Sequence, residues 1–368
     1  MARSKKSTSK GKANEKNENQ HISSQDSCML LQLPGEIRNL IYSHLFTSTR
    51  LTFGKRSISR ISTKRIKPTP NSLAVLRTCS LIKQEAGALW LGQVLFNFEC
   101  VEDMLDKLSV LPSTTLSQIR HIRVSGRPLM LTPIGDDDDI HYRLVWALKL
   151  LPGLCLDTLS VLGLSRGEIA YDTLEGLVKY GNGWKELHFI TPNSSMLGFK
   201  KLDMFMADPY WRKPQPSTWN DILIQRDGVD SGASITIYRS TRFDTPGTVV
   251  KPATRQLFEQ KPPSPEDLET FGVEEERQLL GINERGKELL VVVKRGHHAH
   301  TSEQDSPPYP LEQDIRQWAN GLTWAEIRRQ CIDFSQESDD DPDFIEEDED
   351  VQVDRYNDVD EYAWNPVN

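Results

Sequence analysis

The sequence lacks the features that define membrane, secreted and disulfide-rich proteins. No stretch approaches the ~18 consecutive apolar residues of a membrane-spanning helix, and the first 20 residues are too polar for the apolar core of a secretory signal. The five cysteines lie far apart and form no C-x-x-C pair that could chelate zinc or carry dithiol chemistry. These absences predict an intracellular chain, cytoplasmic or nuclear, with reduced thiols and no membrane contact.

Familiar catalytic motifs are also absent. The sequence contains no G-x-S-x-G, P-loop, H-E-x-x-H or G-x-G-x-x-G pattern. His297, His298 and His300 lie in a Gly-flanked loop without a carboxylate or Cys at helical spacing, which favours a solvated loop over a metal site. The four aspartates at residues 136–139 lack the spaced oxygen ligands of a calcium loop and indicate a charged turn. We therefore expect no enzyme activity, no cofactor and no bound metal.

Both ends of the chain are rich in charge and poor in apolar residues. The N-terminal arm holds Lys5, Lys6, Lys10 and Lys12, which fit either a nuclear import signal or a solvated tail. The C-terminal tail is dominated by Asp and Glu, which repel one another. With only 37% hydrophobic residues overall, the sequence predicts disordered ends. The tail is interpreted as a solvated chain, or as a segment that folds back onto a basic insertion or docks on a partner.

An amphipathic helix is predicted near the N-terminus. Its apolar residues recur every three or four positions on one stripe, and Pro34 stands at a first-turn position where its missing N–H costs nothing. The stripe consists of Leu33, Ile37, Leu40, Ile41 and Leu45. A second helix with the same spacing is expected from residue 73 to residue 90.

The first helix resembles the opening helix of F-box domains. The run L-P-G-E-I-R-N-L-I-Y-S-H-L-F at residues 33–46 begins with Leu-Pro, continues with Glu-Ile and adds a later Ile and Leu, as that helix does. More narrowly, it is similar to the F-box-like segment of a large group of filamentous-fungal proteins. In that group Leu-Pro-x-Glu-Ile-Arg-x-x-Ile-Tyr precedes a helix like L-R-T-C-S-L-I-K-Q-E-A at residues 76–86.

The resemblance implies a role in protein recognition. F-box domains bind the Skp-family adaptor of a cullin-RING ubiquitin ligase, and leucine-rich repeats downstream often hold the substrate. By this resemblance the expected adaptor contacts are Leu33, Pro34, Ile37, Ile41 and Leu45, and the substrate is an unknown protein. An amphipathic helix laid into a groove of its partner is a well-attested recognition mode. In the purely structural interpretation, the same side chains form the core of a small helical subdomain.

The centre of the chain is predicted to consist of α/β units. Three segments share the spacing apolar-x-x-apolar-x-apolar, at intervals of roughly thirty to forty residues. They are Ile119, Ile122 and Val124; Leu156, Leu159 and Val161; and Trp184, Leu187 and Phe189. Helices at residues 140–151 and 168–180 fill the gaps, the second opened by a capping box of Ser165 and Glu168. The pattern indicates irregular leucine-rich-like repeats or a plain α/β sandwich, in either case with parallel strands and right-handed crossovers.

The remainder is predicted to be an α+β extension. Residues 234–238 and 289–294 have strand patterns, Ser264 begins one expected helix, and a capping box of Thr323 and Glu326 begins another. The predicted fold class is thus α+β with an α/β centre. Its parts are a disordered basic arm (1–28), an F-box-like helical module (29–110), an α/β repeat-like region (111–200), an α+β extension (201–335) and an acidic disordered tail (336–368).

A basic insertion at residues 50–67 separates the two N-terminal helices. Its Lys and Arg residues could neutralise several phosphates, but Phe53 is its only aromatic residue for stacking on bases. A solvated hairpin, or an internal partner for the acidic tail, is the simpler interpretation. The sequence therefore predicts a non-enzymatic protein-interaction scaffold, and the F-box resemblance implies that it acts as a substrate-recruiting subunit of a cullin-RING ubiquitin ligase. The alternative is a nucleic-acid or chromatin-associated protein that uses the basic arm and this insertion.

Overall fold

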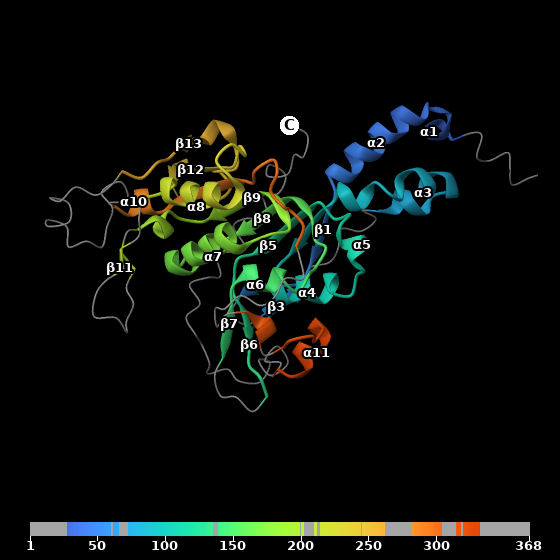
Figure 1. The fold of residues 1–368 in the computed structure, drawn as a ribbon. Helices are drawn as coiled ribbons and strands as arrows, with labels where there is room; N and C mark the ends of the chain where they lie inside the picture. Colours follow the sequence, from blue (N-terminus) through green and yellow to red (C-terminus); the bar gives the residue numbers. More distant parts are fainter. Residues whose placement is uncertain are drawn as a thin grey trace, which may run out of the picture. The chain divides into compact units, whose positions relative to one another are not determined.

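The structure is a computed structural model of the 368-residue chain, shown in Figure 1. It describes residues 28–331 except for 60–61, 66–72, 135–138, 199, 202–209, 212–213, 244, 262–280, 304–313 and 318. The expectations for the basic arm, the acidic tail and the helix at Ser264 lie outside the described residues. The chain divides into two compact units, Met1–Leu45 and Phe46–Asn368. The first contains α1 (Met29–Gln32) and most of α2 (Gly35–Thr47).

The second unit is built on one eight-stranded mixed sheet. Its strand order is β1-β4-β5-β8-β9-β14-β12-β13. The first five strands run parallel, β14 is antiparallel to both β9 and β12, and β13 is antiparallel to β12. The strands are β1 (Arg50–Phe53), β4 (Leu95–Phe98), β5 (His121–Ser125), β8 (Leu156–Leu162), β9 (Trp184–Thr191), β12 (Ser234–Phe243), β13 (Arg255–Leu257) and β14 (Lys287–Lys294).

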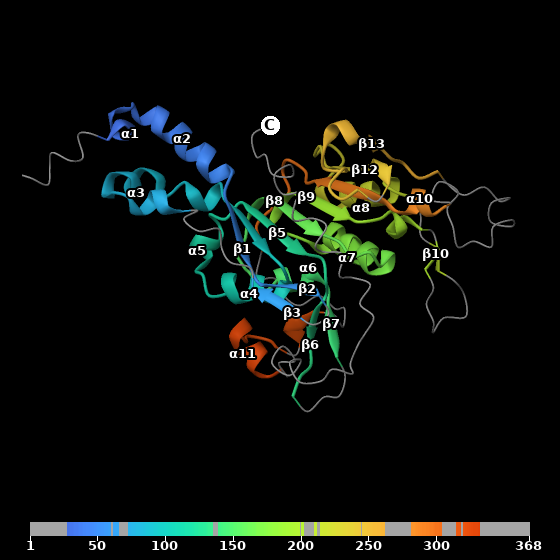
Figure 2. The same cartoon turned by 180° about the vertical axis from the view of Figure 1, so that it is seen from behind.

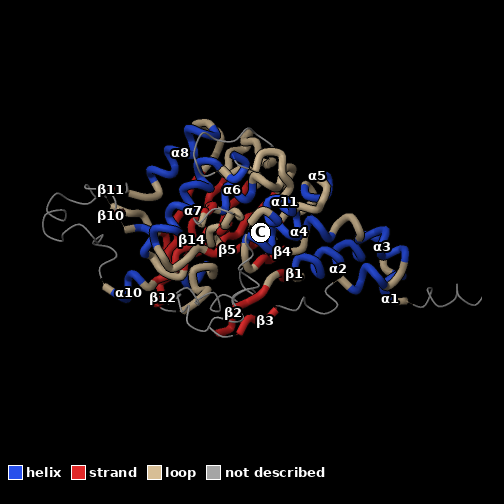
Figure 3. The backbone as a smooth tube through the Cα atoms, turned by 90° about the horizontal axis from the view of Figure 1, so that it is seen from below, coloured by secondary structure: helices blue, strands red, loops and turns tan. Residues whose placement is uncertain are grey.

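Four helices of this unit, at residues 101–108, 144–148, 167–180 and 217–227, lie on one face of the sheet. The first five strands follow one another across the sheet in chain order, so right-handed crossovers return on the same side each time. Figure 3 shows this arrangement, with α6 packed on α7 and α7 on α8. The helices of this unit within the described residues are α3 (Ser80–Ala86), α4 (Val101–Leu108), α5 (Ser113–Leu116), α6 (Leu144–Leu148), α7 (Gly167–Tyr180), α8 (Ser217–Asp227), α10 (Ile282–Arg285) and α11 (Trp324–Arg329).

Three two-stranded hairpins follow the carboxyl ends of parallel strands. They are β2 (Lys55–Ser59) with β3 (Ser62–Arg65), β6 (Leu129–Leu131) with β7 (Ile140–Tyr142), and β10 (Lys200–Lys201) with β11 (Tyr210–Trp211). They come after β1, β5 and β9 respectively. Figure 2 shows the first two at the lower side of the sheet. Because parallel strands end at one edge of a sheet, all three hairpins originate from that edge.

The three repeated apolar phrases stack in register across the sheet. The Cα partners are Ile122, Leu159 and Leu187 in one row, and Val124, Val161 and Phe189 in the next. Each of these side chains is 0% exposed. Their spacing therefore places equivalent residues of neighbouring strands in the same layer of the core. The parallel α/β arrangement predicted for the centre is confirmed, and the leucine-rich-like interpretation stays a proposal.

The module predicted at residues 29–110 is not purely helical. The basic insertion supplies β1 as well as the expected hairpin β2–β3, and β4 lies beside β1 in the main sheet. All four residues of β4 are buried. They include the polar Asn97, whose side-chain oxygen accepts a hydrogen bond from Arg123 at 2.7 Å. A strand buried on both faces does not alternate between apolar and polar residues, so the sequence period gives no strand signal. The α/β fold thus begins at β1.

The second N-terminal helix is shorter than predicted. A 3-10 turn at Ala74–Arg77 precedes α3, and the two are separated by Cys79, which is extended (φ −156°, ψ 165°). The Cys79 sulfur accepts an N–H of the first turn of α3 at 3.5 Å. The Thr78 hydroxyl donates to the Val75 carbonyl at 2.7 Å, a local bond that competes with helix continuation. The expectation of one helix from residue 73 to residue 90 was therefore wrong.

The two helices predicted in the centre have different outcomes. The helix expected at residues 140–151 was wrong at its start, because β7 pairs with β6 and α6 begins only at Leu144. The helix expected at residues 168–180 is confirmed as α7, but its N-cap residue is Arg166 and no side chain caps it. The predicted capping box therefore does not form. The Ser165 carbonyl instead accepts hydrogen bonds from Asn193 and Ser195, both at 3.0 Å.

The C-terminal extension completes the same sheet. β12 and β14 confirm the strands predicted at residues 234–238 and 289–294. The capping box of Thr323 and Glu326 is present at the start of α11, with the Thr323 N–H donating to Glu326 Oε2 at 2.8 Å. Since β14 lies between β9 and β12, the sheet runs across the boundary expected near residue 200.

Two buried ion pairs join distant parts of this unit. Lys149 Nζ lies 2.7 Å from Glu303 Oε1, and both side chains are 0% exposed. The backbone around Glu303 also bonds to Gly153 and Leu154, at 2.8 and 2.7 Å. Arg295 holds Asp227 with two hydrogen bonds of 2.7 and 2.8 Å. The Arg295 guanidinium also donates to the Gly181 carbonyl at 3.1 Å, so Arg295 and the Lys149–Glu303 pair both fasten the C-terminal segments to the α/β centre.

Candidate functional site

Helix α2 carries the residues that the sequence marks for partner binding, and a short turn leads into it from α1. Leu33 is extended (ψ 148°), as the residue before a proline prefers to be. The Pro34 carbonyl accepts the N–H groups of Ile37 and Arg38, both at 3.1 Å. The Arg38 guanidinium donates to the carbonyls of Leu31 and Leu33. Arg38 therefore ties the end of α1 to the first turn of α2.

The apolar stripe predicted on α2 is exposed. The exposed fractions are 36% for Leu33, 43% for Ile37, 57% for Leu40, 41% for Ile41 and 37% for Leu45, and Pro34 is exposed as well. At ~100° per residue, these positions cover an arc of about 140°. We call these six residues the α2 apolar face. All five predicted adaptor contacts belong to it.

The buried side of α2 is one that the sequence analysis missed. Tyr42 and Phe46 are 0% exposed, and they lie about 150° around the helix from the centre of the α2 apolar face. Residues four positions apart lie on the same side of a helix, so the spacing of these two aromatic residues could have predicted a second apolar side. The interpretation of the stripe as a helical core is thus wrong for this structure, because the aromatic pair is buried in its place.

Contact of the α2 apolar face with water is unfavourable in free energy, and a partner that covers the face would remove this contact. Complete burial of a Leu or Ile side chain contributes about 1.5–3 kcal/mol, so covering the exposed two fifths contributes about 0.6–1.2 kcal/mol for each residue. Five such side chains together contribute about 3–6 kcal/mol, from which the entropic cost of association must be subtracted. The face can therefore supply a substantial part of the free energy of one protein contact.

The histidine cluster and the described part of the aspartate cluster form no metal-binding group. His297, His298 and His300 are exposed, and the His297 N–H donates to the Ser231 carbonyl at 2.8 Å. Of residues 136–139, only Asp139 is described, and it accepts a hydrogen bond from Thr132. Among the described residues, no group of three or more His, Cys, Asp or Glu could hold a metal ion.

The cysteines are free thiols. Cys28 is exposed, Cys331 is buried and the other three are half-buried. Burial and the neighbouring carboxylates of Glu102 and Asp103 raise the pKa of the Cys100 thiol far above its ordinary value. The Cys100 thiol also donates to the Asp103 carboxylate at 2.8 Å. It therefore stays protonated at neutral pH and is a poor nucleophile.

The alternative hypothesis, nucleic-acid binding, depends on basic side chains that lie largely outside the described residues. The backbone of the hairpin β2–β3 is described, whereas the side chains from residue 55 to residue 72 are not. Arg50 at the start of β1 is half-buried. Nucleic-acid binding by the insertion therefore stays a prediction.

Comparison with known proteins finds no match: no protein-family model, no curated protein and no solved structure is significantly similar to the chain. Within the described residues, every helix is too short or too polar to cross a membrane.

Proposed function

We propose that the chain is a non-enzymatic protein-interaction scaffold whose F-box-like segment binds a Skp-family adaptor, so that it serves as a substrate-recruiting subunit of a cullin-RING ubiquitin ligase. The observation that carries this proposal is the exposure of the α2 apolar face. The contact residues are Leu33, Pro34, Ile37, Ile41 and Leu45. The resemblance of residues 33–46 to the opening F-box helix supports the choice of partner.

The geometry of α2 supports docking in two ways. The apolar side chains follow one side of a 13-residue helix, which suits a hydrophobic groove on a partner. The bonds from Arg38 hold Leu33 and Pro34 in a defined position at the beginning of the face. The α/β sheet of the second unit would then be the body that carries the surface for the protein substrate.

The test is a pull-down of the full-length chain with a purified Skp-family adaptor, comparing the wild type with the double variant Ile37→Asp and Ile41→Asp. We expect the wild type to retain the adaptor and the variant to lose at least about tenfold in affinity, because two carboxylates would be forced into an apolar interface. The far-UV circular dichroism spectrum should not change, since both side chains are already exposed.

A matched control places the same charge elsewhere. Val110 and Val229 are 73% and 83% exposed and lie outside α2, so the variant Val110→Asp with Val229→Asp should bind the adaptor as the wild type does. Absence of adaptor binding by the wild-type chain contradicts the ligase proposal. Equal losses in the two double variants would show that the α2 apolar face is not the contact surface.

A further inference from the structure

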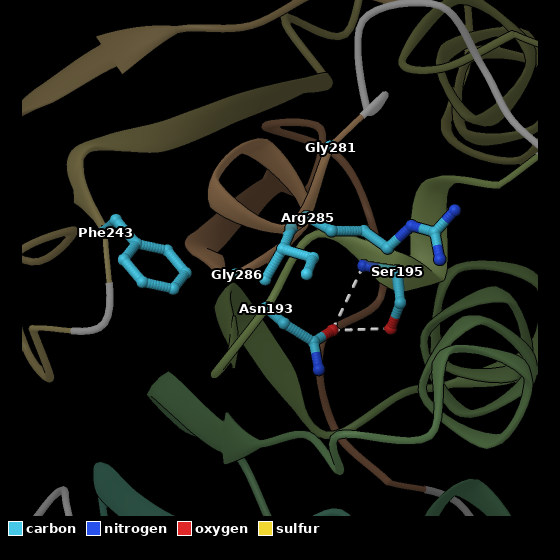
Figure 4. Close-up of a pocket in the computed structure, with 7 residues that line it drawn as sticks. Asn193, Ser195, Phe243, Gly281, Arg285 and Gly286 are labelled. Carbon is cyan, nitrogen blue, oxygen red and sulfur yellow. Dashed lines mark hydrogen bonds between the residues drawn. The ribbon is translucent and has the colours of Figure 1, made fainter.

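A pocket of about 440 Å³ lies beyond the carboxyl ends of the strands β9 and β12. Asn193 and Ser195 follow β9, Phe243 ends β12, and Gly286 immediately precedes β14 (Figure 4). The two strands end at the same edge because both are antiparallel to β14. Ligands of open α/β sheets bind outside the carboxyl ends of the strands, and the volume falls within the ~300–1,000 Å³ of small-molecule sites.

One wall of the pocket is a rigid polar turn. Ser195 donates its N–H to Asn193 Oδ1 at 3.0 Å, and its hydroxyl lies within hydrogen-bond distance of the same oxygen (Figure 4). The Asn193 amide and the Ser195 hydroxyl both bond to the Ser165 carbonyl. The Thr191 hydroxyl donates to the Asn193 carbonyl at 2.7 Å. This wall is therefore formed before any ligand arrives.

The opposite wall is apolar and depends on a glycine. A Cβ atom at Gly286 would lie 2.3 Å from Cε2 of Phe243, so the aromatic ring rests directly on the glycine backbone. Phe243 is 43% exposed and Ile282 is 83% exposed. Both side chains therefore expose apolar surface to solvent at the pocket.

Arg285 supplies the only side-chain cation among the described lining residues. Its backbone is anchored on both sides, because its carbonyl accepts the Ser194 N–H at 2.7 Å and its N–H donates to the Gly281 carbonyl at 3.1 Å. Figure 4 shows its side chain extending over Ser195.

We propose that this pocket binds a small aromatic anion, with its ring against Phe243 and Ile282 and its carboxylate, phosphate or sulfonate on Arg285. An arginine fork matches the oxygens of such a group, while the apolar wall provides the contact area for the ring. The site is separate from the α2 apolar face, so it does not rest on the proposed function.

The experiment is a fluorescence titration of the full-length chain with anilinonaphthalene sulfonate, an aromatic anion that brightens in apolar sites. We expect saturable binding in which one site is affected by substitutions in the pocket. The variant Arg285→Gln should weaken that site about tenfold, because a charge-assisted hydrogen bond is lost. Gly286→Ala should weaken it too by displacing Phe243. Arg242→Gln, which changes an exposed arginine outside the lining, should have no effect.

The class of anion is resolved by displacement. Phenyl phosphate and phenylacetate are titrated against the bound probe, and release by either supports the site and identifies the preferred head group. Release by neither overturns the proposal, as does wild-type affinity in Arg285→Gln or an equal loss in Arg242→Gln. Thermal unfolding of each variant identifies losses caused by unfolding. If Gly286→Ala unfolds, Phe243→Leu is used, and unchanged probe affinity in that variant also overturns the proposal.

Discussion

The pair formed by Lys149 and Glu303 gives the sharpest stability prediction. The change is Lys149→Met, which keeps an unbranched side chain, shorter by one heavy atom, and removes its charge. The Nζ–Oε1 distance is 2.7 Å and both side chains are 0% exposed. Removal of one partner of a buried pair leaves an uncompensated charge and costs about 3–5 kcal/mol. We expect this loss in the free energy of unfolding, measured by urea denaturation at neutral pH.

An exposed pair with the same geometry provides the control. Lys185 Nζ lies 2.6 Å from Asp157 Oδ1, but the side chains are 56% and 41% exposed. Lys185→Met should therefore cost less than about 1 kcal/mol. The double variant Lys149→Met with Glu303→Leu should recover most of the loss, because an apolar pair of similar volume replaces the ion pair. Equal costs for Lys149→Met and Lys185→Met, or a double variant as unstable as the sum of its single changes, would refute the reasoning.

Two further predictions concern pH and close packing. Burial lowers the pKa of His121 from 6.5 to about 4, so the folded state binds the proton more weakly than the unfolded state. The free energy of unfolding is therefore highest above pH 6.5. It decreases by up to about 3 kcal/mol as the pH falls to 4. Urea denaturation between pH 7.5 and pH 4 should show this slope, and it should be reduced in His121→Gln. Gly167→Ala should cost about 1–3 kcal/mol in the same assay, because its Cβ would lie 2.6 Å from the Ser195 backbone. The control Gly198→Ala, whose nearest contact is 3.4 Å, should be nearly neutral.

The sequence predicts the α/β centre well because its strands are short and their apolar spacing repeats. The phrase that ends in Val124 recurs at Val161 and Phe189, and the register puts these residues in one row. The missed features depend on contacts between distant segments. β7 exists because it pairs with β6, and the Ser165 carbonyl bonds to the turn after β9 where a capping box was expected. Local patterns do not contain this information.

The sequence predicts which residues make up the α2 apolar face, but it does not predict that they are exposed. The stripe through Ile37 and Ile41 has the helical period that indicates burial, and Tyr42 and Phe46 have it as well. A helix that is apolar on two sides leaves the choice of buried side to the three-dimensional structure. The pocket was not predictable, because Asn193, Phe243 and Arg285 come from three segments far apart in the chain.

The strand order has a consequence for how this protein can vary. The hairpins β2–β3, β6–β7 and β10–β11 are all inserted after parallel strands, at the edge where those strands end. Lengthening such a connection adds little closure entropy, since each doubling of a loop costs only about 0.6 kcal/mol. Related chains can therefore differ greatly in the length and surface chemistry of these hairpins, while the packing of the sheet and its helices stays the same.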